Sequence, residues 1–178
     1  VDCISWYEAA QFCNYLTSGD KSHGAYLFSG DNTNPGDFIG IDRSLAVSTY
    51  GTVYVIPNHD EWHKAAYYTG SDYSTYANGT NVAPIDGVDA NYGQIIPFHT
   101  GPWNVGSGTI EQNGTFDMMG NVLELNETKV SSSCIIRGGG YAGGELYLRA
   151  STIYSTYTFI ESSGTGFRVA SIPEPATL

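Results

Sequence analysis

Two histidines, His59 and His63, lie four residues apart in a segment with helical character. On a helix this spacing places both imidazoles on one face, from which they can bind zinc. A hydrolytic HExxH helix also carries a glutamate directly after the first histidine, and no glutamate occupies that position here. No third ligand is evident. The sequence therefore favours a solvated helix face, with a hydrolase that uses the histidine pair as a lesser alternative.

The thiols are few. Cys3, Cys13 and Cys134 are the only cysteines, and three cannot all pair within one molecule. Cys13 lies beside Phe12 in a helical pattern, which predicts a buried thiol that acts as a small hydrophobic side chain. Cys3 or Cys134 can form a disulfide, and the sequence does not choose the partner.

Charge and composition restrict the class of protein. The 178 residues amount to one domain, and 7 Lys and Arg against 18 Asp and Glu give a net charge of −11. Such a field repels phosphate backbones and suits divalent cations, so nucleic acid is excluded as a partner. Only 14% of the residues are charged, whereas Gly (22) and Tyr (14) are abundant, as in loop-rich extracellular domains. No apolar run is long enough to span a bilayer.

Two helices are predicted from their N-terminal signals. Ser5 and Glu8 form a capping box ahead of a helical pattern that continues to about Thr17. Asn58 and Glu61 mark the start of the second helix, directly after Pro57.

Short strands and long loops account for the remainder. Residues 52–56, 134–137 and 166–170 are β-type runs. The polar, glycine-rich segments 18–40 and 69–114 are predicted to be irregular.

Three glycine-anchored motifs follow one another in the C-terminal half: FDMMGNVLEL at 116–125, RGGGY at 137–141 and GFR at 166–168. Together with segments 1–17 and 56–66, they resemble the formylglycine-generating-enzyme (sulfatase-modifying factor) family. The resemblance implies an α+β, C-type-lectin-like fold with two helices, small twisted antiparallel sheets and much irregular loop. It covers residues 1–170 and begins without the family's opening strands.

The resemblance also bears on catalysis. Relatives that make formylglycine carry two cysteines just after RGGS(Y/W), and these thiolates hold copper. Residues 140–149 contain no cysteine, and Cu(I) selects soft thiolate ligands. We therefore expect no copper and no formylglycine synthesis. The histidine-bearing helical domain of iron-dependent relatives is not recognisable either.

Calcium is the cofactor that the resemblance implies. By this likeness two side chains and two carbonyls hold the ion: Asp117, Gly120, Val122 and Glu124. The chemistry agrees, because Ca²⁺ takes six to eight hard oxygen ligands and a glycine turn can direct carbonyls inward. The alternative is a turn in which Glu124 pairs with Arg137 or Arg168.

The family's second calcium site would begin at Asn91 and the carbonyl of Tyr92. The acidic residue that completes it in relatives is not visible in 100–108.

Other residues admit both a structural and a binding interpretation. Three arginines match core positions of the family and are expected to form ion pairs and backbone clamps, with anion binding as the alternative: Arg137, Arg149 and Arg168. Five tyrosines have the composition of binding loops or of loop packing: Tyr67, Tyr68, Tyr73, Tyr76 and Tyr92. Three sequons are candidates for glycosylation: Asn78, Asn113 and Asn126.

Residues 171–178 include Pro173-Glu174-Pro175 and resemble the start of a PEP-CTERM sorting signal. The resemblance implies an exported protein of a Gram-negative-type bacterium, extracellular or at the cell surface. The alternative is an accidental proline-rich tail. We expect this tail to lie in a contact between subunits.

The leading hypothesis is thus a non-catalytic extracellular module, structural or binding, in a bacterial surface or matrix assembly such as a fibre. Calcium stabilises it, and its partners are copies of itself, other surface proteins or glycans. The alternative is a divergent metal-dependent oxygenase of the same family.

Overall fold

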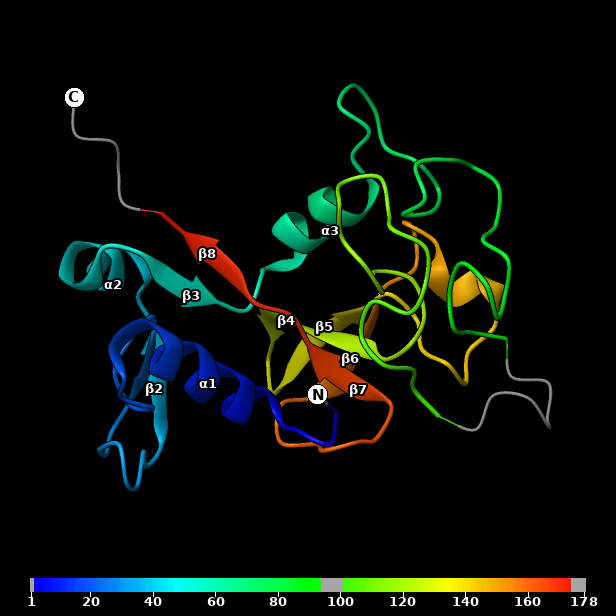
Figure 1. The fold of residues 1–178 in the computed structure, drawn as a ribbon. Helices are drawn as coiled ribbons and strands as arrows, with labels where there is room; N and C mark the ends of the chain where they lie inside the picture. Colours follow the sequence, from blue (N-terminus) through cyan, green and yellow to red (C-terminus); the bar gives the residue numbers. More distant parts are fainter. Residues whose placement is uncertain (1, 94–100, 174–178) are drawn as a thin grey trace. The chain divides into compact units, whose positions relative to one another are not determined.

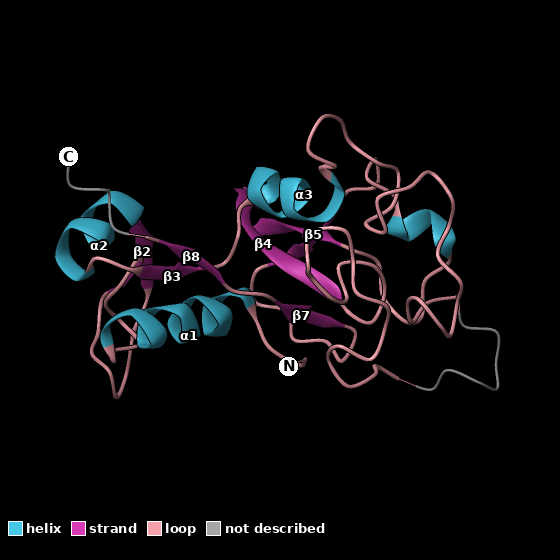
Figure 2. Ribbon diagram, turned by 45° about the horizontal axis from the view of Figure 1, so that its top comes forward, coloured by secondary structure: helices cyan, strands magenta, loops and turns pink. Residues whose placement is uncertain are grey.

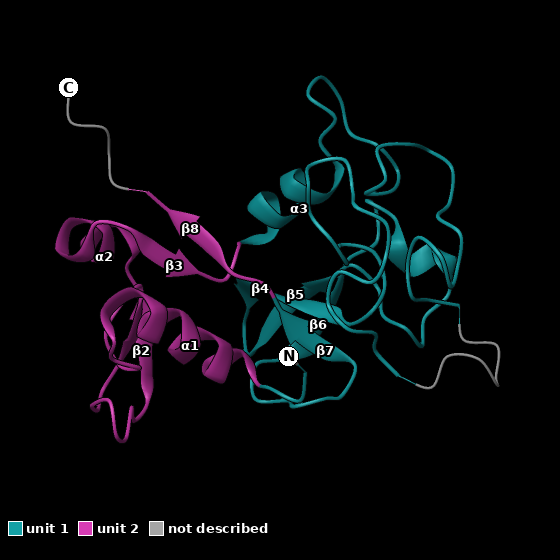
Figure 3. Ribbon diagram, in the orientation of Figure 1, with its two compact units in different colours: residues 1–4, 58–167 teal, residues 5–57, 168–178 magenta. Residues whose placement is uncertain are grey.

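The computed structural model describes residues 2–93 and 101–173 and contains two compact units (Figures 1 and 3). Unit 1 comprises residues 1–4 and 58–167, and unit 2 comprises residues 5–57 and 168–178. Most of the predicted tail, residues 174–178, and the segment 94–100 lie outside the described residues.

Unit 2 begins with helix α1 (Trp6–Ser18). Ser5 accepts from the amide of Glu8 and the Glu8 carboxylate accepts from the amide of Ser5, so the predicted capping box is confirmed. Gly19 caps the C-terminus of the helix, and its φ of 79° suits a residue without a side chain. Cys13 is buried, which also confirms its predicted role.

The prediction of a loop over 18–40 was wrong in part, because strands β1 (Tyr26–Phe28) and β2 (Phe38–Ile41) pair antiparallel there. Two tertiary contacts outweigh the polar composition. The ring of Tyr26 packs edge-on against Trp6 at 5.5 Å. The buried Asn14 amide donates to the Tyr26 carbonyl at 2.6 Å and accepts from its amide at 3.1 Å.

Helix α2 (Arg43–Tyr50), capped by Asp42, had no predicted counterpart. Strand β3 (Val53–Val55) confirms the predicted run at 52–56, and it pairs antiparallel with β8 (Ala170–Ile172). Ser171 and Ile172, which were assigned to the tail, therefore lie in a strand.

Unit 1 holds helix α3 (His59–Tyr67) and one four-stranded sheet (Figure 2). The capping box of Asn58 and Glu61 is present as predicted. The strands are β4 (Leu123–Val130), β5 (Ser133–Arg137), β6 (Tyr154–Tyr157) and β7 (Thr165–Phe167).

Their order is β6-β5-β4-β7, and β7 runs parallel to β4, so this sheet is mixed rather than antiparallel throughout. A short 3₁₀ helix, η1 (Glu145–Leu148), precedes β6. The α+β fold is confirmed, with one more α-helix than predicted.

The irregular segment of unit 1 is held by a core rather than by strands. Residues 69–93 and 101–114 contain no helix or named strand, as predicted. Their apolar side chains pack on α3 and η1 in one cluster: Trp62, Ala66, Tyr67, Tyr76, Ala77, Ala90, Tyr92, Met118, Met119 and Leu148. The side chain of Gln112 donates to the Ala66 carbonyl at 2.9 Å, which ties the segment to the end of α3.

Candidate functional site

The segment from Asp117 to Glu124 is a strained turn that leads into β4. Asp117, Gly120 and Asn121 have φ values of 58°, 75° and 62°. A Cβ on Gly120 would lie 2.3 Å from the carbonyl oxygen of Asn91, so only glycine fits. The Asn121 amide donates to that same carbonyl at 2.8 Å. The structure thus brings the two predicted calcium segments, 91–92 and 117–124, into contact.

The two acidic side chains have different neighbours. The Oδ2 atom of Asp117 accepts from the Gly106 amide at 2.8 Å. Glu124 is 5% exposed, and its Oε2 accepts from the indole nitrogen of Trp62 at 2.6 Å. Burial and a charge-assisted hydrogen bond fix the Glu124 carboxylate toward the core.

Glu111, which the sequence analysis did not select, is a second buried carboxylate beside this turn, in addition to Glu124. Its Oε1 accepts from the Met119 amide at 3.1 Å and its Oε2 from the Met118 amide at 3.2 Å. The side chain is 6% exposed. Its only sequence signal is an isolated acid in a polar loop, which by itself predicts a solvated side chain.

Asn91 supplies the most direct sign of a hard-metal donor. Its side chain is 1% exposed and its Nδ2 donates to the Gly101 carbonyl at 3.1 Å, whereas its Oδ1 has no hydrogen-bond partner among residues 2–93 and 101–173. A buried amide oxygen without a donor is costly, and it is a ligand type that Ca²⁺ accepts. The Tyr92 amide donates to Asp86 at 3.2 Å. Within residues 2–93 and 101–173, no three His, Cys, Asp or Glu side chains group as metal ligands.

The histidine pair lies on a partly covered helix face, so the predicted solvated face was wrong in part. The His63 ring lies 6.0 Å from the His59 ring and 5.0 Å from that of Tyr73, and both imidazoles are half-buried. Burial, with a smaller effect from the nearby Arg137 charge, lowers the pKa of both histidines.

Arg137 is a backbone clamp, as expected. It is 1% exposed and donates to the carbonyls of Ala150, at 2.9 Å, and Thr152. Its guanidinium lies 5.4 Å from the Trp62 ring centroid and 5.7 Å from that of Tyr67.

Most of the selected tyrosines are packing residues. Tyr67, Tyr76 and Tyr92 are buried, and the Tyr67 hydroxyl donates to the Leu148 carbonyl at 2.9 Å. The Tyr76 hydroxyl donates to Glu145. Arg149 donates to Glu145 at 2.8 Å, which agrees with the predicted ion-pair role for this arginine.

The three sequons differ in exposure. Asn126 is fully buried in β4, which leaves no space for a glycan in the folded chain. Asn113 is exposed, but its Nδ2 donates to the carbonyls of Ala65 and Tyr68 at 2.8 and 3.1 Å. Asn78 lies at the surface, where its Oδ1 accepts from the Thr80 hydroxyl at 3.0 Å.

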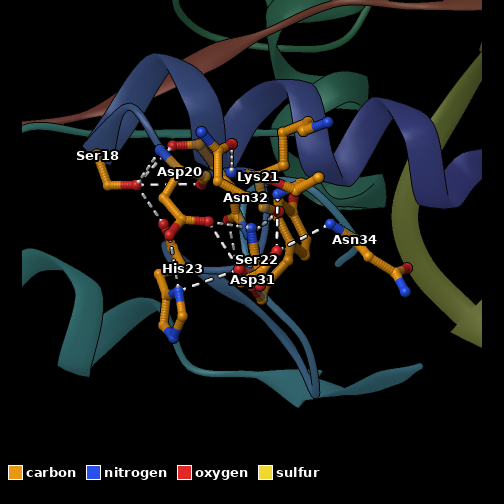
Figure 4. Close-up of polar contacts among 11 residues, drawn as sticks. Ser18, Asp20, Lys21, Ser22, His23, Asp31, Asn32 and Asn34 are labelled. Atoms are coloured by element: carbon orange, nitrogen blue, oxygen red, sulfur yellow. Dashed lines mark hydrogen bonds and ion pairs between the residues drawn. The ribbon is translucent and has the colours of Figure 1, made fainter. Parts of the chain in front are cut away.

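In unit 2, the turn after α1 brings Asp20, Ser22 and His23 together (Figure 4). Asp20 accepts from the Ser22 hydroxyl at 2.7 Å and lies 3.2 Å from His23 Nδ1. The hydrogen bond from Ser22 lowers the pKa of Asp20. Ser22 is fully buried and its hydroxyl donates a hydrogen bond to the Asp20 carboxylate, so this trio stabilises the turn rather than presenting a nucleophile.

Residues 140–144 line a groove of about 610 Å³ together with Tyr147 and Ser162–Gly164. Its walls are glycine, alanine, tyrosine, serine and Leu123, without a thiol. Cys134 is buried in β5, and burial raises its pKa to about 11. Cys13 is buried in α1 and Cys3 is exposed, and none of the three cysteines is in a disulfide. The residues present therefore do not fit copper.

Residues 1–172 match the model of the sulfatase-modifying factor enzyme 1-like domain family. The chain belongs to this family. A curated relative, the Chaperone protein LppX of Paenibacillus barcinonensis, is 26% identical over 167 residues. The alignment covers 79% of this chain and 58% of that protein, so the chain spans little more than half of the relative's length.

Solved structures show the same fold at low identity. The crystal structure of CarF has a TM-score of 0.74 at 21% identity and covers 98% of this chain and 67% of its own. Treponema denticola variable protein 1 has a TM-score of 0.67 at 20% identity, covering 98% and 71%. PvdO from Pseudomonas aeruginosa has a TM-score of 0.59 at 16% identity, covering 98% and 62%. In the described part of the chain, every helix is too short or too polar to cross a membrane.

Proposed function

We propose that this chain is a non-catalytic extracellular module, structural or binding, of a bacterial surface or matrix assembly. The observation that carries the proposal is the thiol-free groove at residues 140–144, because copper chemistry in this family needs two thiolates at that place. The chain keeps the core of the fold, and Gly, Tyr and Ser line the groove where the ligands would stand.

The names of the relatives support a non-catalytic role for the fold. One is called a chaperone and another a variable protein, and neither name states an oxidase activity. Export and surface location are part of the proposal and rest on the PEP-type tail at 171–178. Asn78 and Asn113 are the proposed glycan acceptors, because both lie at the surface.

We further propose that calcium stabilises the module at the turn described above: Asp117, Gly120, Val122 and Glu124. The contact between this turn and Asn91 supports the proposal, because no described residue donates a hydrogen bond to Asn91 Oδ1, and this oxygen is a ligand type that a cation would satisfy. Asn91 and the Tyr92 carbonyl are the proposed start of the second site. The carboxylates of Asp117 and Glu124 and the carbonyls of Gly120 and Val122 would hold the ion, which would compensate their negative charge.

The test is thermal unfolding with and without a calcium chelator. Metal bound only by the folded chain at a hundredfold excess over Kd adds about 2.7 kcal/mol, or roughly 5 to 11 °C in Tm for a chain of this size. We expect the native chain and the surface control Asp37→Ala to lose this increment on chelation. Asp117→Ala should show no chelator response. A native Tm that the chelator leaves unchanged would refute the calcium site.

A further inference from the structure

Strand β6 forms one edge of the four-stranded sheet. β5 pairs with it on one side, and no strand of the described residues pairs with the other side. Tyr154, Ser155 and Tyr157 are all exposed. An open edge of this kind presents backbone donors and acceptors to another strand.

The hydrogen-bond ladder indicates which groups face outward. The Thr158 amide donates to the Ser132 carbonyl on the β5 side at 3.1 Å. Inward and outward residues alternate along an antiparallel pair, so Ser155 and Tyr157 direct their amides to the open side. The Tyr157 carbonyl already accepts from the Ile160 amide at 3.1 Å. Ser155 therefore offers both an outward N–H and an outward C=O.

Aromatic side chains extend the edge on both faces of the sheet. Tyr154 stacks on Tyr147 with ring centroids 5.3 Å apart, and Tyr157 stacks on Phe159 at 5.4 Å. Tyr154 and Tyr157 are three residues apart on a strand and so point to opposite faces. Tyr154, Tyr157 and Phe159 are 45%, 55% and 62% exposed. Exposed aromatic side chains beside an open edge, on both faces of the sheet, favour an interaction site there.

The distribution of charge indicates which partner pairs with the open edge of β6. Residues 150–160 contain no charged residue and no proline, although the whole chain carries −11. Natural edge strands are usually protected by Lys, by Pro or by a bulge. Residues 150–160 contain neither Lys nor Pro. A basic partner would be drawn to the acidic surface elsewhere. Two copies of this chain repel one another, and they approach at least cost where the surface is uncharged.

We infer that β6 pairs antiparallel with β6 of a second copy of this chain about a two-fold axis. A two-fold contact uses the same surface on both copies. In an antiparallel pair, outward-facing residues lie opposite one another, so Ser155 of one copy would lie opposite Ser155 or Tyr157 of the other. The pairing closes the edge and covers the two aromatic stacks. This pairing makes a second copy of the chain the partner in the proposed assembly, and its biological role rests on that proposed function.

Two substitutions at Ser155 test the contact by sedimentation of the full chain over a range of concentrations. Ser155→Pro removes the outward amide from each copy and should weaken association by about 30-fold, as expected for two lost hydrogen bonds. Ser155→Lys sets like charges near one another and should also favour the monomer. Ser107→Lys, an exposed site in the loop before Asp117, makes the same charge change away from the edge and should leave the dimer intact.

Thermal melts of the variants confirm that each is folded, and the lysine variant keeps the test valid if proline disturbs the strand. A native chain that sediments as a monomer at every attainable concentration overturns the inference, as does a dimer that both Ser155 variants leave unchanged. A monomeric native chain that binds an uncharged extended peptide also overturns it and assigns the edge to another protein. None of these results bears on catalysis, so failure of this contact is distinguishable from failure of the non-catalytic role.

Discussion

The hydrogen bond between Trp62 and Glu124 joins α3 to β4, and its contribution to stability can be predicted. Both side chains are buried, and the indole nitrogen lies 2.6 Å from Oε2. Trp62→Phe removes the donor, which for a hydrogen bond to a charged group costs about 1.5 to 3 kcal/mol. The smaller ring also leaves a void, and the total loss in free energy of unfolding should be about 3 to 5 kcal/mol.

A double-mutant cycle with Glu124→Gln separates the two effects. Glutamine keeps an oxygen acceptor but not the charge, so the cost of Trp62→Phe should fall by about 1 to 2 kcal/mol in the glutamine background. Urea unfolding in the presence of chelator measures all four chains without a contribution from calcium. If the two substitutions changed the free energy of unfolding additively, the carboxylate of Glu124 and the indole of Trp62 would not interact, and the reasoning would be refuted.

Two further predictions concern the turn and the histidines. Gly120→Ala should destabilise unit 1 by about 3 kcal/mol or more, because the new methyl meets the Asn91 carbonyl and φ is positive; Gly70→Ala, at φ 99° with open space around it, should cost about 1 kcal/mol. Equal melting temperatures for the two variants would contradict this account. Folding lowers the pKa of His59 and His63, so the unfolded chain binds more protons below its histidine pKa of about 6.5. Stability should therefore be complete above that pH and fall as the pH drops toward the folded pKa, and a His59→Gln, His63→Gln double variant should show a shallower fall in urea titrations. An unaltered slope would count against buried neutral imidazoles.

Local signals predicted both capped helices correctly, because Ser5 with Glu8 and Asn58 with Glu61 satisfy helix amides within a few residues. The irregular character of residues 69–93 and 101–114 was equally visible in their composition. The β1–β2 pair was missed because a distant contact, Asn14 with Tyr26, decides it.

The site was predictable only where a motif encodes it. The residues from Asp117 to Glu124 were identified because their motif resembles the calcium-binding turn of the family. Glu111 was not, because its partners are the backbone amides of Met118 and Met119, which no sequence pattern connects to it. The parallel pairing of β4 with β7 depends in the same way on contacts remote in sequence.

The most direct test of the central claim is a search for formylglycine on a cysteine-containing sulfatase-type peptide. The full chain is incubated with Cu(I), oxygen and the peptide, and the peptide mass is followed. Because residues 138–149 contain no thiol, we predict no aldehyde and no oxygen consumption above that of a copper-only control. Conversion of the peptide cysteine to an aldehyde by this chain would contradict the account.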